Sequence, residues 1–156
     1  MLDTKIIPNL KAPIPLTHPV LPTKFCFRSG ITAVLRWIKE DEYPKVYDMF
    51  LEAMKGGHGY TTDEYPTYEI FLSLSIDGNY CGILENAATG QMLAFLMSGT
   101  HPGLKRYGQK CANGSALINP KFRGLGIGSE LMMYWVSALK AIGFEYMIAD
   151  TALVNA

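Results

Sequence analysis

Apolar residues recur every three or four positions between residues 43 and 54, which is the spacing of one face of an α-helix. Acidic residues precede this stretch and Pro44 stands in its first turn, as is typical of a helix N-terminus. Gly56 and Gly57 follow it and are typical of a helix end. The pattern therefore predicts a helix with one buried stripe. The stripe consists of Tyr43, Val46, Tyr47, Phe50, Leu51 and Met54.

A second helical stripe lies between two apolar stretches near the C-terminal end. It begins at Ile127 and ends before Gly143, while residues 111–118 and 146–154 on either side are typical of strands. Two strands joined by a helix are expected to be parallel, with a right-handed crossover. The pair Asn113 and Gly114 is expected to weaken or bulge the first of these strands. The stripe consists of Ile127, Leu131, Tyr134, Trp135, Ala138 and Ile142.

The remaining elements are shorter. Residues 31–38 predict a first strand, and residues 80–85 and 92–98 predict an antiparallel hairpin. Residues 67–76 are compatible with either a helix or a strand, and we favour a short second helix. The first 24 residues hold five of the nine prolines, so we expect an extended arm there and a single domain over residues 25–156.

Charge and composition exclude several classes of protein. Fourteen Lys and Arg balance fourteen Asp and Glu without a basic cluster, so no nucleic-acid partner is expected. No apolar run is long enough to span a bilayer and no signal peptide is evident, so we expect no membrane association and a cytoplasmic or nucleocytoplasmic protein. The three cysteines and three histidines lack ligand spacing, so we expect no metal and expect each cysteine to be buried.

The segment with the clearest chemistry joins the strand at residues 111–118 to the long helix. Its glycines leave backbone N–H groups accessible at a helix N-terminus, which is an anion site suited to a pyrophosphate. A Rossmann loop needs a glycine at position 129 or 131, where Ser129 and Leu131 stand, and a Walker loop needs a lysine that is absent. The segment is Arg123, Gly124, Leu125, Gly126, Ile127, Gly128 and Ser129.

Arg123-x-x-Gly126-x-Gly128, after a strand that ends in Leu117-Ile118-Asn119-Pro120, resembles the coenzyme A loop of the GNAT superfamily of N-acetyltransferases. The order of elements from about residue 32 onward is similar to that family as well. The resemblance implies an α+β fold with a mixed, mostly antiparallel twisted sheet flanked by helices. It implies a parallel strand–helix–strand coenzyme A motif, and the family's C-terminal helix and last two strands are expected to be missing after Ala156.

The resemblance also implies a cofactor site for acetyl-CoA. The backbone of Leu117, Ile118 and Asn119 would hold the pantetheine arm, and residues 123–129 would bind the pyrophosphate. Asn155 stands where the family often has an asparagine that contacts the cofactor.

The implied reaction is direct acetyl transfer to a small-molecule or peptide amine. The acceptor must lose a proton, and Glu64, Glu69 and His58 are the candidate bases, with Tyr60, Tyr65 and Tyr68 as candidate pocket residues. The alternative is a truncated module that binds coenzyme A or a partner without turnover. A homodimer is compatible with either reading.

Overall fold

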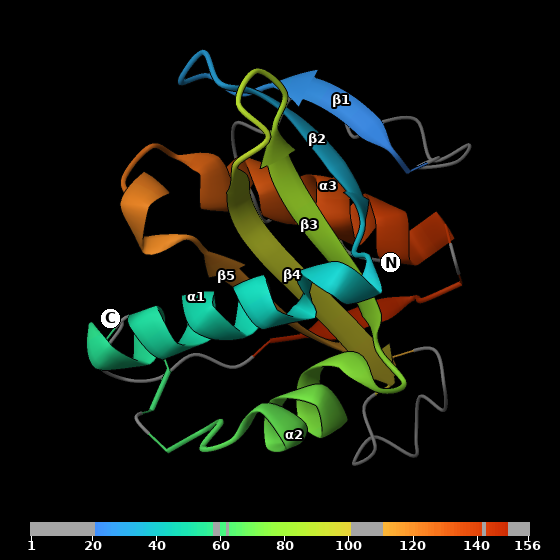
Figure 1. Ribbon diagram of the computed structural model, residues 1–156. Helices are drawn as coiled ribbons and strands as arrows, with labels where there is room; N and C mark the ends of the chain where they lie inside the picture. The colour runs from blue at the N-terminus through green and yellow to red at the C-terminus, as the bar shows by residue number, and fades with distance from the viewer. Residues whose placement is uncertain (1–20, 58–59, 62, 101–110, 142, 150–156) are drawn as a thin grey trace.

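The computed structural model describes residues 21–57, 60–61, 63–100, 111–141 and 143–149, which build one six-stranded sheet with helices on both faces (Figure 1). The strands lie in the sheet in chain order, and each pair of neighbours is antiparallel except the last, which is parallel. The strands are β1 (Thr23–Cys26), β2 (Thr32–Trp37), β3 (Tyr80–Asn86), β4 (Met92–Thr100), β5 (Cys111–Ile118) and β6 (Tyr146–Ile148). The helices are α1 (Tyr43–Lys55), α2 (Tyr68–Phe71) and α3 (Ile127–Ala141), with short turns η2 (Glu40–Glu42), η3 (Leu72–Ile76) and η5 (Pro120–Phe122).

This arrangement confirms the predicted mixed, mostly antiparallel sheet. The helix predicted from the stripe at residues 43–54 is α1, and the helix that follows the glycine loop is α3. The ambiguous residues 67–76 are helical as favoured, and Thr67 begins the turn because its Oγ1 accepts a hydrogen bond from the Ile70 N–H at 3.3 Å. The predicted hairpin is β3 and β4.

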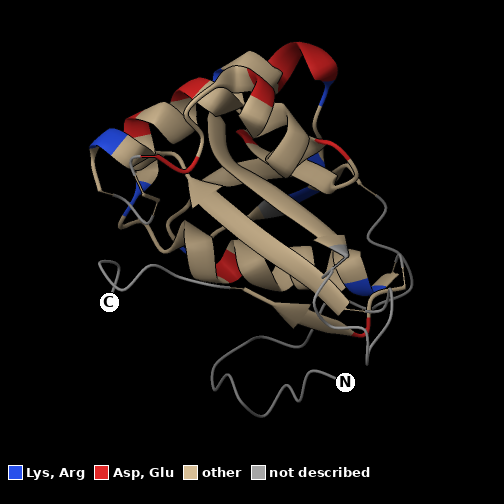
Figure 2. Ribbon diagram, turned by 90° about the horizontal axis from the view of Figure 1, so that it is seen from below, with Lys and Arg blue, Asp and Glu red and all other residues tan. Residues whose placement is uncertain are grey.

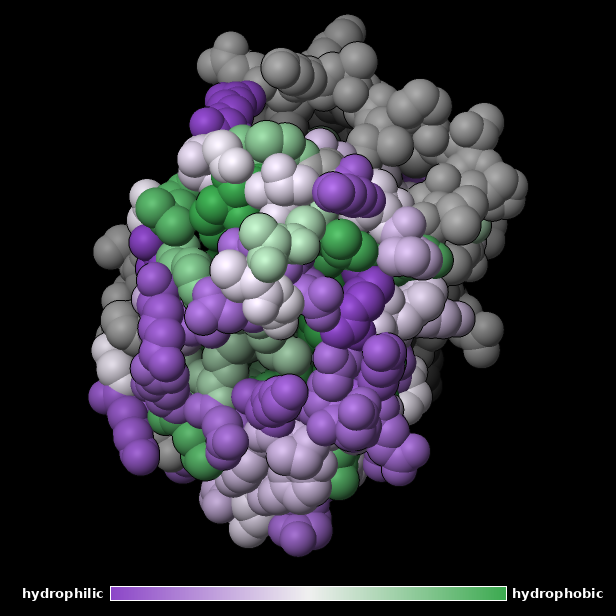
Figure 3. Space-filling view, turned by 45° about the horizontal axis from the view of Figure 1, so that its top comes forward, coloured by the Kyte–Doolittle hydropathy of each residue, from purple (hydrophilic) through white to green (hydrophobic). Residues whose placement is uncertain are grey.

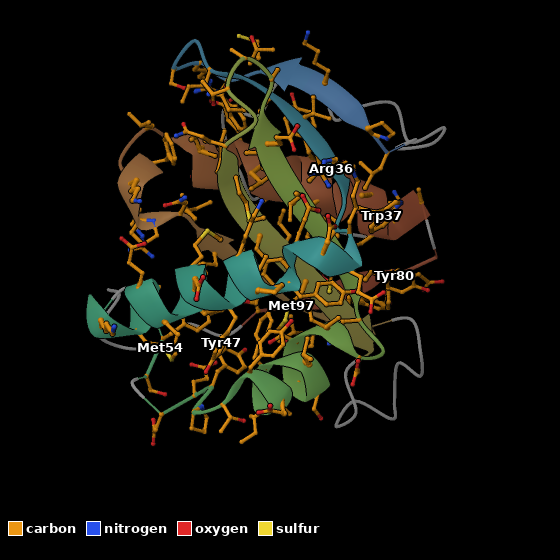
Figure 4. All side chains as sticks on the ribbon, viewed as in Figure 1. Arg36, Trp37, Tyr47, Met54, Tyr80 and Met97 are labelled. Carbon is orange, nitrogen blue, oxygen red and sulfur yellow. The ribbon has the colours of Figure 1, made fainter. Side chains whose placement is uncertain are left out.

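An ion-pair triad holds the N-terminus of α1 against the sheet. Arg36 on β2 contacts Glu42 at 2.6 Å and Glu85 on β3 at 2.7 Å, and Figure 4 places Arg36 beside η2. The hydrogen bond from Arg36 lowers the pKa of Glu42 below its ordinary value, and the Lys39 N–H adds to this effect. Because Glu42 directly precedes α1, the triad sets where that helix begins on the sheet.

The sheet face covered by α3 has a core centred on Trp135. This side chain is fully buried and its indole N–H donates to Ser98 Oγ at 3.0 Å, which satisfies a polar atom that burial would otherwise leave unpaired. A Cβ at Gly82 would lie 2.8 Å from Trp135 Cζ3, so a glycine is required for the ring to lie this close to β3. Most of the remaining core on this face is aliphatic. It includes Leu35, Leu84, Leu93, Leu96, Ile127, Leu131 and Leu139.

The opposite face, covered by α1 and α2, has an aromatic core. Phe50 is fully buried and its ring contacts four other rings at centroid distances between 4.8 and 5.8 Å. Tyr47 packs between α1 and α2, where its ring lies 5.4 Å from that of Tyr68 (Figure 4). The partners of Phe50 are Tyr60, Tyr65, Phe71 and Phe95.

Three local expectations differ from the structure. A strand, β1, begins at Thr23, inside the segment expected to be an extended arm, because its residues find β2 as a partner; residues 1–20 lie outside the described residues. Cys26 on this edge strand is exposed, so the expectation of burial is wrong for it and confirmed for Cys81 and Cys111. The register of β5 is regular through Gly114, and an irregularity lies instead at residues 84–85 of β3.

Charged side chains are unevenly distributed over the described elements. Figure 2 shows acidic residues gathered along η2 and α1, while the sheet and α3 carry few charges. This distribution leaves the faces of the sheet free for apolar packing.

Candidate functional site

The glycine loop leads into α3 in a conformation that ordinary residues avoid. Gly124 and Gly126 have φ angles of +77° and +73°, in the left-handed region that favours glycine. A Cβ at either position would meet no atom within 4 Å, so these glycines serve the backbone conformation rather than close packing. The loop turns the chain into the first turn of α3, where N–H groups without intrahelical partners and the positive end of the helix dipole suit an anion.

Gly128 has a different purpose from the other two loop glycines. A Cβ there would lie 3.6 Å from Ile118 Cγ1, which is ordinary contact, so the start of α3 lies directly against the end of β5. Glu130 in the same first turn accepts a hydrogen bond from the Arg28 N–H at 3.3 Å, and the Arg28 side chain lies 3.8 Å from it. The helix N-terminus is therefore held both by β5 and by the turn after β1.

Asn119 has a positioning role that the sequence pattern did not reveal. Its side chain accepts a hydrogen bond from the Lys121 N–H at 3.1 Å and donates one to the Met92 carbonyl at 2.9 Å. It therefore caps η5 and ties the loop entrance to the start of β4. A Pro after an Asn is a usable signal for such a cap, since proline suits the first position of a helical turn.

One edge of β5 is without a strand partner over most of its length among the described residues. β4 pairs with residues 112–118 of β5, whereas β6 pairs only with residues 111–113. The Asn119 N–H donates to the Leu93 carbonyl on the β4 side. Backbone N–H and C=O groups alternate between the two edges of a strand. The backbone groups of Leu117 and Ser115 therefore also point toward β4. Those of Ile118, Ala116 and Gly114 point toward the other edge.

Gly114 is the first residue of β5 beyond the described pairing with β6. A Cβ at Gly114 would collide with Met147 Cε and would lie 2.8 Å from Ser98 Oγ, so a larger residue here would have to displace both side chains. Among the described residues, the edge of β5 without a strand partner, here called the free edge, runs from Gly114 to Ile118, and its far end adjoins the glycine loop.

Tyr60 reaches this strand from the connection between α1 and α2. Its hydroxyl lies 2.7 Å from Ser115 Oγ, and its ring packs edge-on against Phe50 at 4.8 Å. Burial raises the pKa of Tyr60 to about 12, and among the smaller contributions Glu64 raises it further and Arg123 lowers it. The Tyr60 and Ser115 hydroxyls thus form a pair at Ser115, which lies between Gly114 and Ala116 on β5.

The predicted base candidates are placed unequally. Glu69 is fully exposed, and hydrogen bonds from its own amide and the Thr67 hydroxyl lower its pKa, which makes it a weaker base. Glu64 is exposed as well and accepts a hydrogen bond from the Thr61 N–H at 3.3 Å, yet it lies near enough to Tyr60 to affect its ionisation. His58 and the predicted cofactor residue Asn155 lie outside the described residues.

The other two candidate pocket tyrosines are engaged in packing. Tyr65 is buried against Phe50 and Phe71, and Tyr68 packs on Tyr47 and Phe71. Tyr60 is the one of the three whose hydroxyl is hydrogen-bonded to a described residue of β5.

A cavity of about 250 Å³ lies beside the loop entrance but on the β4 side of β5, away from the free edge. Six of its lining residues are polar or charged and three are apolar. Figure 3 shows hydrophilic and apolar side chains interspersed over one face of the protein. Asn119, as the cap of η5, contributes to its wall, so this cavity and the loop share a support. The lining residues are Lys45, Asp48, Met49, Glu52, Gln91, Met92, Asn119, Lys121 and Phe122.

The described ranges show neither a metal-binding cluster nor a membrane-spanning helix. No group of three or more His, Cys, Asp or Glu side chains there is placed to hold a metal ion. In the same part of the chain, no helix combines the length and apolar character needed to cross a membrane.

The fold matches that of known acetyltransferases. The profile of the Acetyltransferase (GNAT) family matches residues 32–156, which is most of the sequence. A comparison with curated protein sequences gives no match.

Solved structures share the fold at low sequence identity. A GCN5-related N-acetyltransferase from Kribbella flavida has a TM-score of 0.62 and 22% identity, over 74% of this chain and 69% of that one. A candidate phosphinothricin N-acetyltransferase has the same score and identity over 75% and 72% of the two chains. A candidate acetyltransferase from Salmonella typhimurium, solved with its cofactor acetyl-CoA, has a TM-score of 0.60 and 13% identity over 75% and 68%.

The family match and the shared fold together define the class of this protein. The chain belongs to the acetyltransferase (GNAT) family.

Proposed function

We propose that this protein is an acetyl-CoA-dependent N-acetyltransferase that transfers the acetyl group directly to an amine. The observation that carries the proposal is the continuity of the site. The edge of β5 that lacks a strand partner in the described part of the chain leads from Gly114 to Ile118 and ends at a glycine loop on the N-terminus of α3. A ligand with a pyrophosphate at one end and an extended amide-containing arm would match both parts.

The pyrophosphate is assigned to the loop. The N–H groups of residues 124–129 and the Arg123 guanidinium would bind it, since the glycines admit a phosphate close to the backbone. The arm would then run back along the free edge of β5 like an added strand. On that edge the available backbone groups belong to Ile118, Ala116 and Gly114, so Leu117 and Asn119 support the arm through the strand rather than by bonding it.

The reaction needs an oxyanion donor and a neutral amine. The N–H of Gly114 or Ala116 would polarise the thioester carbonyl and stabilise the tetrahedral intermediate. An alkyl ammonium has a pKa of about 10 and must lose its proton before it attacks. Glu64, Glu69 and His58 are retained as candidate bases for that step.

Binding is tested by thermal unfolding. At about 100 times Kd, acetyl-CoA is expected to raise the Tm by roughly 5–10 °C. Gly126→Glu should abolish this shift, because it places a carboxylate in the phosphate site. Gly90→Glu is the matched control: Gly90 has φ +70° and no neighbour within 4 Å of an added Cβ, so it suffers the same backbone strain away from the loop. An equal shift in Gly126→Glu and wild type would refute the loop assignment.

Turnover is tested by release of free thiol from acetyl-CoA with a panel of amines. The panel includes phosphinothricin, because one structural neighbour is a candidate phosphinothricin N-acetyltransferase. It also includes amino acids, polyamines and peptides with a free N-terminus. Thiol release that depends on an amine would support catalysis. A Tm shift without thiol release for any amine would instead favour a module that binds coenzyme A without turnover.

A further inference from the structure

The hydroxyl pair of Tyr60 and Ser115 is not explained by packing alone. The two residues are 55 positions apart, and their 2.7 Å contact joins the α1–α2 connection to β5. Ser115 lies between Gly114 and Ala116, the two residues whose N–H groups face the free edge beside the expected thioester. Among the residues that the structure describes, no carboxylate is hydrogen-bonded to either hydroxyl.

The length of the strand places the pair near the reacting atoms. A strand rises about 3.3 Å per residue, so Gly114 lies roughly 13 Å from Ile118 along β5. An arm anchored at the loop that pairs with Ile118 and then with Ala116 brings its thioester beside Gly114 and Ser115.

We propose, resting on the acetyltransferase function above, that Ser115 and Tyr60 form a hydroxyl relay that protonates the sulfur of coenzyme A as it leaves. Ser115 is the catalytic residue because its hydroxyl would contact the sulfur. Tyr60 acts through Ser115 and is a positioning residue that also supplies the next proton.

The relay balances the proton of the reaction. Attack of a neutral amine on the thioester gives a tetrahedral intermediate with a positively charged nitrogen. When the C–S bond breaks, its electron pair goes to sulfur, and sulfur takes the hydroxyl proton of Ser115. Ser115 takes the proton of Tyr60, and Tyr60 regains one that the charged nitrogen releases. The products are the neutral amide and the free thiol, and both hydroxyls are restored.

The surroundings of Tyr60 favour a donor rather than a base. Its pKa of about 12 keeps the phenol protonated through the neutral range, because burial outweighs its hydrogen bond to Ser115. The charged and titratable groups that act on it are Tyr65 and Glu64, which raise its pKa, and Arg123, which lowers it. When the Tyr60 hydroxyl donates to Ser115, the hydrogen of the Ser115 hydroxyl remains available for donation to the coenzyme A sulfur.

The relay is tested without any acceptor by titrating the thiol of bound coenzyme A, followed by thiolate absorbance in the ultraviolet. A hydroxyl that donates to sulfur stabilises the thiolate, so the bound thiol in wild type is expected to titrate about one pKa unit lower than in Tyr60→Phe or Ser115→Ala. Ser115→Thr keeps the hydroxyl and should restore the lower value. Equal titration in wild type and Ser115→Ala would overturn the relay.

The matched control is Tyr47→Phe, which removes another hydroxyl of the same aromatic core. That hydroxyl donates to the Tyr65 carbonyl at 3.1 Å, and no hydrogen bond joins it to the described residues of β5. The thiol titration of Tyr47→Phe is expected to equal that of wild type. A shift as large as that of Tyr60→Phe would indicate a general packing effect and refute the relay.

Kinetics provides the second measurement. With an amine that supports turnover in wild type, Ser115→Ala and Tyr60→Phe are each expected to lower kcat roughly 100-fold, the lower end of the contribution of general acid catalysis. The KM for acetyl-CoA and the Tm shift should be retained, and the double variant should be no slower than Ser115→Ala, because the two hydroxyls act in series. Wild-type binding with unchanged kcat in both variants would refute the relay alone. Absence of an acetyl-CoA Tm shift in wild type would refute the proposed function and the relay with it.

Discussion

The two faces of the sheet are built in different ways. The α3 face depends on one large side chain, Trp135, surrounded mainly by aliphatic residues and fitted against Gly82. The α1/α2 face depends on a network of rings around Phe50, contributed by α1, α2, β4 and the α1–α2 connection. The first core orients the helix that carries the glycine loop, and the second holds Tyr60 against Ser115.

The difference separates two demands on the site. The proposed pyrophosphate site needs a rigid helix start, which one helix packed on a strand can supply. The proposed proton donor needs side chains from distant segments beside the strand, and the ring network holds Tyr60 in that position. Substitutions on the two faces should therefore affect binding and turnover differently.

The largest effect is expected for Trp135→Ala on the α3 face. Removing a fully buried indole should reduce the free energy of unfolding by about 4 kcal/mol, measured from denaturant midpoints. Lys140→Ala is the control on the exposed side of the same helix and should change it by less than about 0.5 kcal/mol. Equal midpoints for the two variants would contradict the view that this ring anchors the face.

A matched pair of variants compares the two faces directly. Phe50→Leu and Trp135→Phe should each lower the free energy of unfolding by about 2 kcal/mol, the first through lost ring contacts and the second through lost volume and the bond to Ser98. At saturating acetyl-CoA, only Phe50→Leu should lower kcat, because Tyr60 loses the ring that supports it. An equal fall in kcat for both would show that the faces are not separable.

The ion-pair triad on the α1 side predicts a pH dependence. The pKa of Glu42 is lowered in the folded state, so its contribution is present above its ordinary value of 4.5 and is lost as the pH falls through the lower folded value. Glu42→Gln should cost about 1 kcal/mol at neutral pH, measured by urea unfolding, and the difference from wild type should shrink as the pH drops below 4.5. Glu40→Gln, on the exposed side of the same turn, is the control and should show a much smaller change. A difference that stays constant with pH would exclude the ion pair as its source.

The smallest effect is expected at the start of α2. Thr67→Ala removes the cap on the Ile70 N–H and should lower the free energy of unfolding by roughly 0.5–1 kcal/mol, since the site is exposed. Thr67→Ser keeps the accepting oxygen and should remain close to wild type in the same urea measurement. A loss in Thr67→Ser as large as in Thr67→Ala would assign the effect to the methyl group instead.

The sequence by itself determined the features that depend on neighbours in the chain. The stripe of α1 and that of α3 were visible because helical period and glycine ends are local signals. The parallel strand–loop–helix–strand unit and its glycine loop were visible for the same reason, since a handedness rule links adjacent elements.

Tertiary structure decided what depends on contacts across the chain. From the sequence, Tyr60, Tyr65 and Tyr68 were equivalent candidates for pocket residues. Only the fold shows that the Tyr60 hydroxyl reaches β5 while the other two rings pack in the core. The sequence also suggested that the backbone of Leu117 and Asn119 would hold the pantetheine arm. Pairing with β4 instead directs the backbone groups of these two residues toward β4. The physical reason is the same in each case: periodicity shows which side of an element is buried, whereas the partner that covers it is chosen by packing among distant segments.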